Sequence, residues 1–256
     1  MNEARPQRAA ERGGAPREPK SMLDSAALRT RLADVRDRLT RAAGRAGRDP
    51  AGIRLVAISK TFDADYVRAA ADCGQIDFGE NKVQEALQKM DQTADLPICW
   101  HLVGHLQSNK AKKAGLRFDV VHSIDSADLV SRLDEAAGGA RRSLQLLVQV
   151  DLAGEATKFG ARAEGLPSIF EGARSCRSAR VVGLMLLPPT VDDAEQARPH
   201  FRALRAIRDR LLARGVDAAM LGELSMGMSH DFEVAVEEGA TIVRVGTAIF
   251  GPRTWV

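Results

Sequence analysis

The sequence has 256 residues, of which 45% are hydrophobic and 4% aromatic, so aliphatic side chains can bury a large core in one α/β barrel or in two smaller domains. With 37 basic and 34 acidic residues, the charge is nearly balanced and argues neither for nor against a nucleic-acid partner; we predict none. The three cysteines are far apart and odd in number, which indicates neither a disulfide framework nor a zinc cluster and favours the cytoplasm.

The first twenty residues mix arginine with glutamate, glycine and proline and contain no apolar run. This composition predicts a disordered tail over residues 1–20, without the apolar region of a secretory signal. No stretch of the chain approaches about eighteen uninterrupted apolar residues, so we predict no membrane span. Residues 21–256 are expected to form a single domain, with Met22 as an alternative first residue.

A helix is the first regular element expected. Leu28, Leu32, Val35 and Leu39 fall on one stripe at helical spacing, and the stretch "AAGRAGRDP" supplies glycines and a proline that stop the helix. This helix precedes the repeating part of the chain.

After this helix, short strand patterns alternate with helical ones. Strands are expected at 53–59, 76–79, 98–103, 119–124, 144–151, 181–186, 219–224 and 241–246, and helices between them at 64–72, 82–90, 127–137, 163–175 and 200–214. Eight strand-then-helix units predict a single (β/α)8 TIM barrel with an extra N-terminal helix. A doubly wound open sheet is the competing fold, but no G-x-G-x-x-G motif follows the first strand.

The first strand ends in a lysine. In "LVAISKTF" (55–62), alternation places Val56, Ile58 and Lys60 on one face, so Lys60 is expected at the rim of an apolar interior. In such barrels the chemistry lies at the carboxyl ends of the strands. The alternative for a lone lysine is a side chain that only reaches water.

The last two strands end in loops of small polar residues. "SMGMS" (Ser225 to Ser229) follows strand seven, and "GTA", which begins with Gly246 and Thr247, follows strand eight; each precedes a helix. Backbone N–H groups at such positions bind anions, and the loops after strands seven and eight of these barrels often bind a phosphate. Ordinary glycine and serine turns are the alternative for either loop alone.

Arg244 lies on the strand before the second loop and shares a face with Ile242 and Gly246. Neither face of a barrel strand accepts an unpaired guanidinium, so we expect either a ligand or an ion pair with a carboxylate such as Glu80. A lysine, a phosphate loop and an arginine together favour pyridoxal 5′-phosphate (PLP), which forms a Schiff base with lysine. An arginine facing the pyridine nitrogen disfavours its protonation and makes the ring a poorer electron sink.

Several motifs also carry a resemblance to a known family. "LVAISKTF", "FGENKVQEA", "WHLVGHLQSNK", "HSIDS", "GLMLLPP" and "LSMGMSHDFEVAVEEGATIVRVGTAIFG" resemble the pyridoxal phosphate homeostasis protein family, from about Leu28 to Gly251. This resemblance implies a fold-type III barrel similar to the N-terminal domain of alanine racemase, with PLP held as a Schiff base on Lys60. It further implies Arg244 at the pyridine nitrogen, Asn81 near the ring, and Ser225, Gly227, Gly246 and Thr247 at the phosphate.

Two positions qualify the resemblance. Family members often have a basic residue where this chain has Phe62, and Lys158 matches a second family lysine that could accept the aldehyde. Among the histidines, His101 is a candidate for the mouth of the site and His122 for a hydrogen-bonded core residue.

The family consists of cofactor carriers or regulators of vitamin B6 and amino-acid balance, so the resemblance implies little turnover. A two-base racemase of this fold needs a second acid or base, and the one tyrosine, Tyr66, follows the first strand. We therefore predict a cytoplasmic PLP-binding protein, a monomer or weak homodimer, with PLP-dependent apo-enzymes as transient recipients. A racemase-like enzyme is the main alternative, and a Schiff-base aldolase acting on a sugar phosphate is the second.

Overall fold

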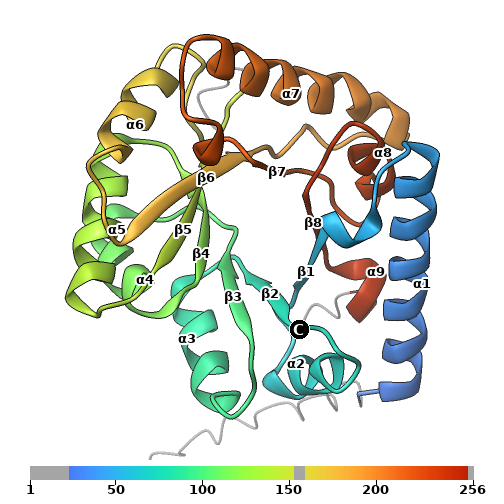
Figure 1. Cartoon of the computed structure of the whole chain (residues 1–256). Coiled ribbons are helices and arrows are strands. Elements are labelled where there is room, and N and C mark those ends of the chain that lie inside the picture. The colour runs from blue at the N-terminus through green and yellow to red at the C-terminus, as the bar shows by residue number, and fades with distance from the viewer. Residues whose placement is uncertain (1–22, 153–158, 253–256) are drawn as a thin grey trace, which may run out of the picture.

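Eight parallel strands form a closed barrel in the computed structural model, which describes residues 23–152 and 159–252 (Figure 1). The strands are β1 (Arg54–Ile58), β2 (Asp77–Glu80), β3 (Cys99–Leu102), β4 (Val120–Ile124), β5 (Leu144–Gln149), β6 (Ala179–Met185), β7 (Glu223–Ser225) and β8 (Ile242–Val245). Each strand pairs with its neighbours in sequence, and β1 pairs with β8 from Arg54↔Ile242 to Ala57↔Val245. The predicted (β/α)8 barrel is confirmed. The expected tail and Lys158 lie outside the described residues.

Helices surround the barrel on its outer side (Figure 1). They are α1 (Ser25–Arg45), α2 (Ala64–Ala71), α3 (Val83–Gln92), α4 (Ala111–Arg117), α5 (Ala127–Gly139), α6 (Leu166–Ala173), α7 (Arg198–Ala213), α8 (Phe232–Glu237) and α9 (Thr247–Phe250), with short 3-10 turns η1 (Pro50–Gly52), η2 (Ser108–Lys110), η3 (Ala194–Ala197) and η4 (Ala218–Met220). None of the helices in the described ranges combines the length and apolarity that crossing a membrane requires.

Helix α1 is the extra N-terminal helix that the sequence predicts. Its stripe of Leu28, Leu32, Val35 and Leu39 is buried, and the helix runs beside α2, α8 and α9 (Figure 1). Asp24 accepts a 3.0 Å hydrogen bond from the first turn, as an N-cap aspartate does. The amphipathic stripe thus attaches α1 to helices from both ends of the chain.

The strands separate two apolar layers because their side chains alternate between the barrel interior and the helices. The inner layer consists of Val56, Ile58, Val103, Val120, Leu147, Met185 and Ile242. A larger outer layer fills the space between strands and helices. Val56 and Ile58 face the interior as predicted, so the first strand points its alternate side chains along the inside of the barrel towards Lys60.

Two elements differ from the sequence-based expectation. Strand β7 begins at Glu223, four residues later than predicted, because the apolar residues before it form the 3-10 turn η4, which Asp217 caps. Helix α4 occupies the lysine-rich stretch that follows β3, where no helix was expected. It is held by a narrow stripe of small buried residues, Ala111, Ala114 and Gly115, which carries little periodic hydrophobic signal.

Candidate functional site

Lys60 lies in the turn that leaves β1, two residues beyond the last strand residue, Ile58. Its side chain is half-buried, whereas Ile58 belongs to the inner apolar layer. The carboxyl end of β1 is the position at which the barrel fold places chemistry. An amine there is accessible to a small molecule and borders the apolar interior.

The backbone around Lys60 is held on both sides by side chains from α3. Lys89 Nζ donates a 2.8 Å hydrogen bond to the carbonyl oxygen of Ser59, and the N–H of Thr61 donates a 2.6 Å bond to Glu85 Oε1. Thr61 has a φ of 73°, a left-handed conformation that β-branched residues rarely adopt. Such strain persists only where the surroundings enforce it, and it marks functional turns.

A buried ion pair anchors this turn. Lys89 Nζ lies 2.6 Å from Glu80 Oε1, which also accepts a 2.7 Å bond from the Ser59 hydroxyl. Glu80 is fully buried, and its Oε2 has no hydrogen-bond partner. Burial therefore raises the pKa of Glu80, although Lys89 and Ser59 oppose the shift. Since Glu80 pairs with Lys89, the alternative of an ion pair between Glu80 and Arg244 is wrong.

Arg244 is buried inside the barrel near the carboxyl ends of the last strands. Its Nη1 donates a 2.6 Å hydrogen bond to Ser225 Oγ, and its Nη2 donates a 2.9 Å bond to the carbonyl oxygen of Leu186. Burial lowers the pKa of Arg244 to about 10, with Asp231 opposing the shift. The guanidinium is still protonated at neutral pH, and the two bonds fix the plane of this buried cation.

The two predicted loops lie side by side and meet at Ser229. Ser229 Oγ accepts hydrogen bonds from the N–H groups of Gly246 (3.1 Å) and Ala248 (3.3 Å). Both amides therefore donate to one point, where an oxygen atom can be bound. Ser225 lies deeper, fully buried, with its hydroxyl bonded to Arg244. Sequence reasoning gave Ser229 only as a loop residue and a possible helix cap, because the alternation of a strand does not extend into the turn and cannot say where its hydroxyl lies.

Glycines leave room in both loops. A Cβ atom on Gly227, whose φ is 92°, would lie 2.6 Å from the Cβ of Ala235, so no side chain fits there. A Cβ atom on Gly246 would lie 3.3 Å from the carbonyl oxygen of Ile58. Thr247 is exposed. The bare backbone, exposed hydroxyl and convergent amides fit the predicted phosphate of a cofactor.

Asn81 follows β2 and is half-buried. Gly104, after β3, packs directly on it, because a Cβ atom on Gly104 would lie 2.2 Å from the backbone oxygen of Asn81. The backbones that follow β2 and β3 thus pack so closely that position 104 has no room for a side chain.

Replacing Gly104 by alanine is expected to destabilise the protein by about 1–3 kcal/mol, because the added methyl group must push the backbone of Asn81 away. Chemical denaturation monitored by circular dichroism would measure the loss. Gly139→Ala is the matched control, since a Cβ atom there meets nothing within 4 Å. Equal stability of the two variants would contradict the close packing of Asn81.

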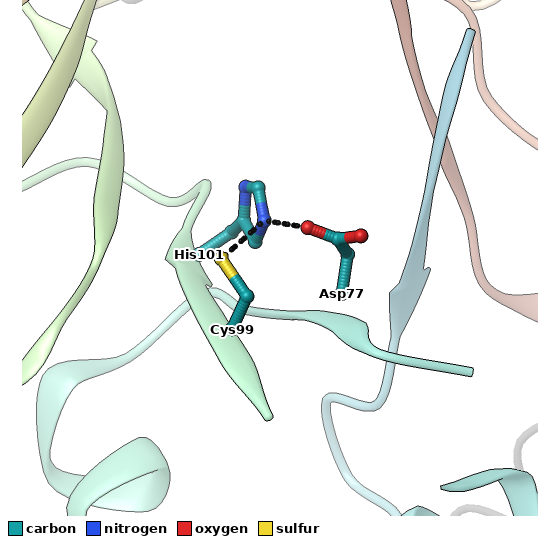
Figure 2. Close-up of side chains that lie close together, drawn as sticks. All are labelled: Asp77, Cys99 and His101. Carbon is teal, nitrogen blue, oxygen red and sulfur yellow. Dashed lines mark hydrogen bonds and ion pairs between the residues drawn. The ribbon is translucent and has the colours of Figure 1, made fainter. Parts of the chain in front are cut away.

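The opposite end of the barrel interior contains a second polar cluster, shown in Figure 2. Asp77 on β2 and Cys99 and His101 on β3 point towards one another; His101 Nε2 lies 2.9 Å from Asp77 Oδ1 and 3.5 Å from Cys99 Sγ. Arg54 Nε lies 3.8 Å from Asp77 Oδ1. Burial raises the pKa of the Cys99 thiol to about 12, with Asp77 adding to the shift. The hydrogen bonds of His101 and the nearby Arg54 cation thus explain why these polar side chains lie together inside the barrel.

Two buried histidines extend this cluster through the interior. His101 Nδ1 lies 2.9 Å from His122 Nε2, and His122 Nδ1 lies 2.9 Å from Ser225 Oγ. Burial lowers the pKa of both histidines, and the nearby Arg244 cation contributes to the larger lowering at His122. The prediction of His122 as a hydrogen-bonded core histidine is confirmed. His101 is fully buried, so its placement at the site mouth is wrong.

Comparisons with known proteins agree with this architecture. Residues 25–254 match the family model of the alanine racemase N-terminal domain. The chain is 42% identical to the pyridoxal phosphate homeostasis protein of Aquifex aeolicus, over 88% of this chain and 98% of the relative. It is 44% identical to the protein of the same name from Pseudomonas aeruginosa, over 88% of this chain and 95% of that protein.

Solved structures give the same picture. The structure of PipY from Synechococcus elongatus with PLP bound is similar at a TM-score of 0.77 and 39% identity, over 88% of this chain and all of the PipY chain. Alanine racemase from Corynebacterium glutamicum is similar at a TM-score of 0.68 and 15% identity, over 90% of this chain and 62% of the racemase. This last similarity concerns the fold alone.

Proposed function

The chain belongs to the pyridoxal phosphate homeostasis protein family, and from this membership we propose that it binds PLP and serves intracellular PLP and amino-acid homeostasis. The relatives that share this name cover nearly the whole domain, and a similar protein has been solved with PLP bound. The proposed ligand therefore agrees with both the motifs and the relatives.

One observation carries the proposal: the strand that leads to Lys60 pairs with the strand that carries Arg244. Val56 is the direct partner of Arg244, and Ile58 contacts the position of Gly246. One region at the carboxyl ends of β1 and β8 is thus bordered by the amine of Lys60, the buried cation of Arg244 and the loop of Ser229, where backbone amides can bind an oxygen atom. A Schiff-base aldolase would use the amine and the loop but leaves the buried cation without a role.

When bound, PLP supplies an aldehyde that forms a Schiff base with an amine, and a pyridine ring that can accept electrons. We assign the aldehyde to Lys60 and the pyridine nitrogen to Arg244, and we place Asn81 near the ring. Gly227, Gly246 and Thr247 would hold the phosphate, together with the hydroxyl of Ser229. Ser225, predicted as a phosphate residue, would also act through its bond to Arg244.

We propose binding and delivery of PLP in place of substantial turnover. The guanidinium of Arg244 disfavours a proton on the pyridine nitrogen, which weakens the ring as an electron sink. Tyr66 packs with Phe62 and Phe250, at ring-centroid distances of 4.9 and 6.5 Å, in an aromatic cluster beside the turn of Lys60. A racemase-like activity is the alternative, and it requires an opposing acid or base.

The proposal also covers the partners, compartment and oligomeric state of the protein. PLP-dependent apo-enzymes would be the transient recipients of the cofactor, and the protein would act in the cytoplasm as a monomer or weak homodimer. Cys73, Cys99 and Cys176 are free thiols in the structure, which suits a reducing compartment.

Titration of the purified protein with PLP tests the function. We expect a visible absorption band that saturates at one cofactor per chain, and borohydride reduction followed by peptide mass analysis should place the cofactor on Lys60. A chain that develops no band at saturating PLP would refute cofactor binding and favour the aldolase alternative, which is then tested with sugar phosphates under the same reduction.

A further inference from the structure

A continuous line of hydrogen bonds crosses the inside of the barrel. It links Asp77, His101, His122, Ser225 and Arg244 through contacts of 2.9, 2.9, 2.9 and 2.6 Å. The residues come from β2, β3, β4, β7 and β8. All except Asp77 are at most 3% exposed, so water does not compete for these bonds.

The donors can be assigned from the Asp77 end. The pKa of Asp77 is lowered despite its burial, because His101 and Arg54 favour the carboxylate. An ionised carboxylate only accepts hydrogen bonds, so His101 Nε2 must carry the proton. His101 is neutral, as its lowered pKa requires, and its Nδ1 is therefore an acceptor. The proton between the two histidines must then belong to His122 Nε2.

The Arg244 end of the chain agrees with this assignment. Arginine has only donors, so Ser225 Oγ accepts from Arg244 Nη1. With Nε2 protonated, neutral His122 has a bare Nδ1, and the Ser225 hydroxyl must donate to it. The hydroxyl can make both bonds at once, because its oxygen accepts from Arg244 while its hydrogen is donated to His122. Every bond therefore points the same way, from Arg244 through Ser225, His122 and His101 to Asp77.

We propose that Asp77, His101, His122 and Ser225 are positioning residues that hold Arg244 in place through this one-way hydrogen-bond chain. The inference rests on the proposed function only where it assigns Arg244 to the cofactor. Asp77 sets the tautomers of both histidines, and these turn the hydrogen of Ser225 away from Arg244. At Ser225 the guanidinium of Arg244 then faces an oxygen lone pair and no hydroxyl hydrogen.

The chain has a physical consequence for a distant site. Hydrogen bonds in series polarise one another, and an unmade bond is costly in a dry interior. If the donors were reversed, the Ser225 hydrogen could not point at His122 and would compete with the arginine N–H. A change at Asp77, at the opposite end of the barrel interior, is therefore felt at Arg244.

Nuclear magnetic resonance tests the direction of the chain. Two-bond 1H–15N spectra of the imidazole rings distinguish the two neutral tautomers and the cation, with assignment by single His→Gln variants. We expect both His101 and His122 as neutral rings with the proton on Nε2. A protonated His101, or His122 with its proton on Nδ1, would overturn the proposal. The measurement needs no cofactor, so it is independent of the proposed function.

Two pairs of variants test the effect on the cofactor. Ser225→Ala is expected to weaken PLP binding about tenfold and to shift the visible band. Ser123→Ala is its control, because Ser123 is also a buried strand serine but its hydroxyl has no hydrogen-bond partner. Asp77→Ala is expected to weaken PLP binding about threefold. Arg54→Gln is its control: it removes the charge beside Asp77 but keeps the Asp77 carboxylate as the acceptor for His101, so PLP binding should be unchanged.

The outcomes separate the two proposals. If Ser225→Ala and Asp77→Ala bind PLP as the unchanged protein does, with the same band, the positioning role is refuted while PLP binding stands. If the unchanged protein does not bind PLP, the proposed function fails, and the histidine tautomers alone decide the direction of the chain.

Discussion

Lys60→Ala is expected to abolish covalent attachment of PLP and leave the barrel folded. Lys60 lies half-exposed in the turn after β1, outside the apolar layers, so its removal should change the free energy of unfolding by less than about 1 kcal/mol. The amine, by contrast, has no substitute on the alanine variant. Visible absorption and borohydride reduction followed by mass analysis would measure attachment, and circular dichroism the fold.

Lys82→Ala is the matched control, because Lys82 is an exposed lysine at the start of α3. It should retain the full absorption band. A Lys60→Ala variant that still carries reducible cofactor would move the attachment elsewhere, and Lys158 is the first candidate. Loss of the band together with loss of the fold would show that Lys60 is a structural residue.

Lys89→Met is expected to lower the free energy of unfolding by about 3–5 kcal/mol, because it leaves the carboxylate of Glu80 buried without its cation. The turn of Lys60 would also lose the Lys89 bond to Ser59 and the cation that helps to lower the pKa of Glu85 against its burial. Denaturant unfolding measures the first effect. A reduced rate or affinity of PLP attachment measures the second.

The pH dependence of this variant has a definite sign. The pKa of Glu80 is raised in the folded protein, so the folded state binds a proton more tightly than the unfolded chain does. The stability that Glu80 contributes is therefore fully present below the ordinary pKa of 4.5 and is lost as the pH rises through its raised folded value. Lys89→Met should enlarge this loss and extend it to higher pH, since the ammonium no longer opposes the effect of burial on the pKa of Glu80.

The double variant Glu80→Gln/Lys89→Met provides the control. Removing both charges should recover most of the stability, because the cost of Lys89→Met is the unpaired carboxylate and not the lost packing. A double variant as unstable as Lys89→Met would instead assign the effect to packing around α3.

The sequence predicted the barrel because the two patterns that reveal it, the periods of strands and of helices, are local. Strand and helix periods are short, and the apolar runs of β1 and β8 are long enough to be read alone. Strand β7 was misplaced because the apolar residues of η4 look like strand, and α4 was missed because alanine and glycine form its buried stripe. Elements without a periodic apolar signal are therefore the ones that the sequence leaves open.

The site was partly predictable for the same reason. Closure of eight strands makes the first and last strands neighbours, so Lys60 and Arg244 could be placed together before any coordinates. The meeting of Asp77, Cys99 and His101 could not, because it depends on the register of β2 against β3, Asp77↔Cys99. The hydroxyl of Ser229 was likewise set by loop geometry, which no period describes.

The pairing of β1 with β8 has a consequence for the order in which the protein matures. Lys60 follows the first strand, and Arg244 belongs to the last, so a ribosome must deliver almost the entire domain before both are present. Bringing such distant segments together is the slow, entropically costly step of assembly. A cofactor bound across the β1–β8 pairing would bind only completely folded barrels and would oppose their unfolding. The supply of the vitamin would therefore govern the lifetime of the folded protein.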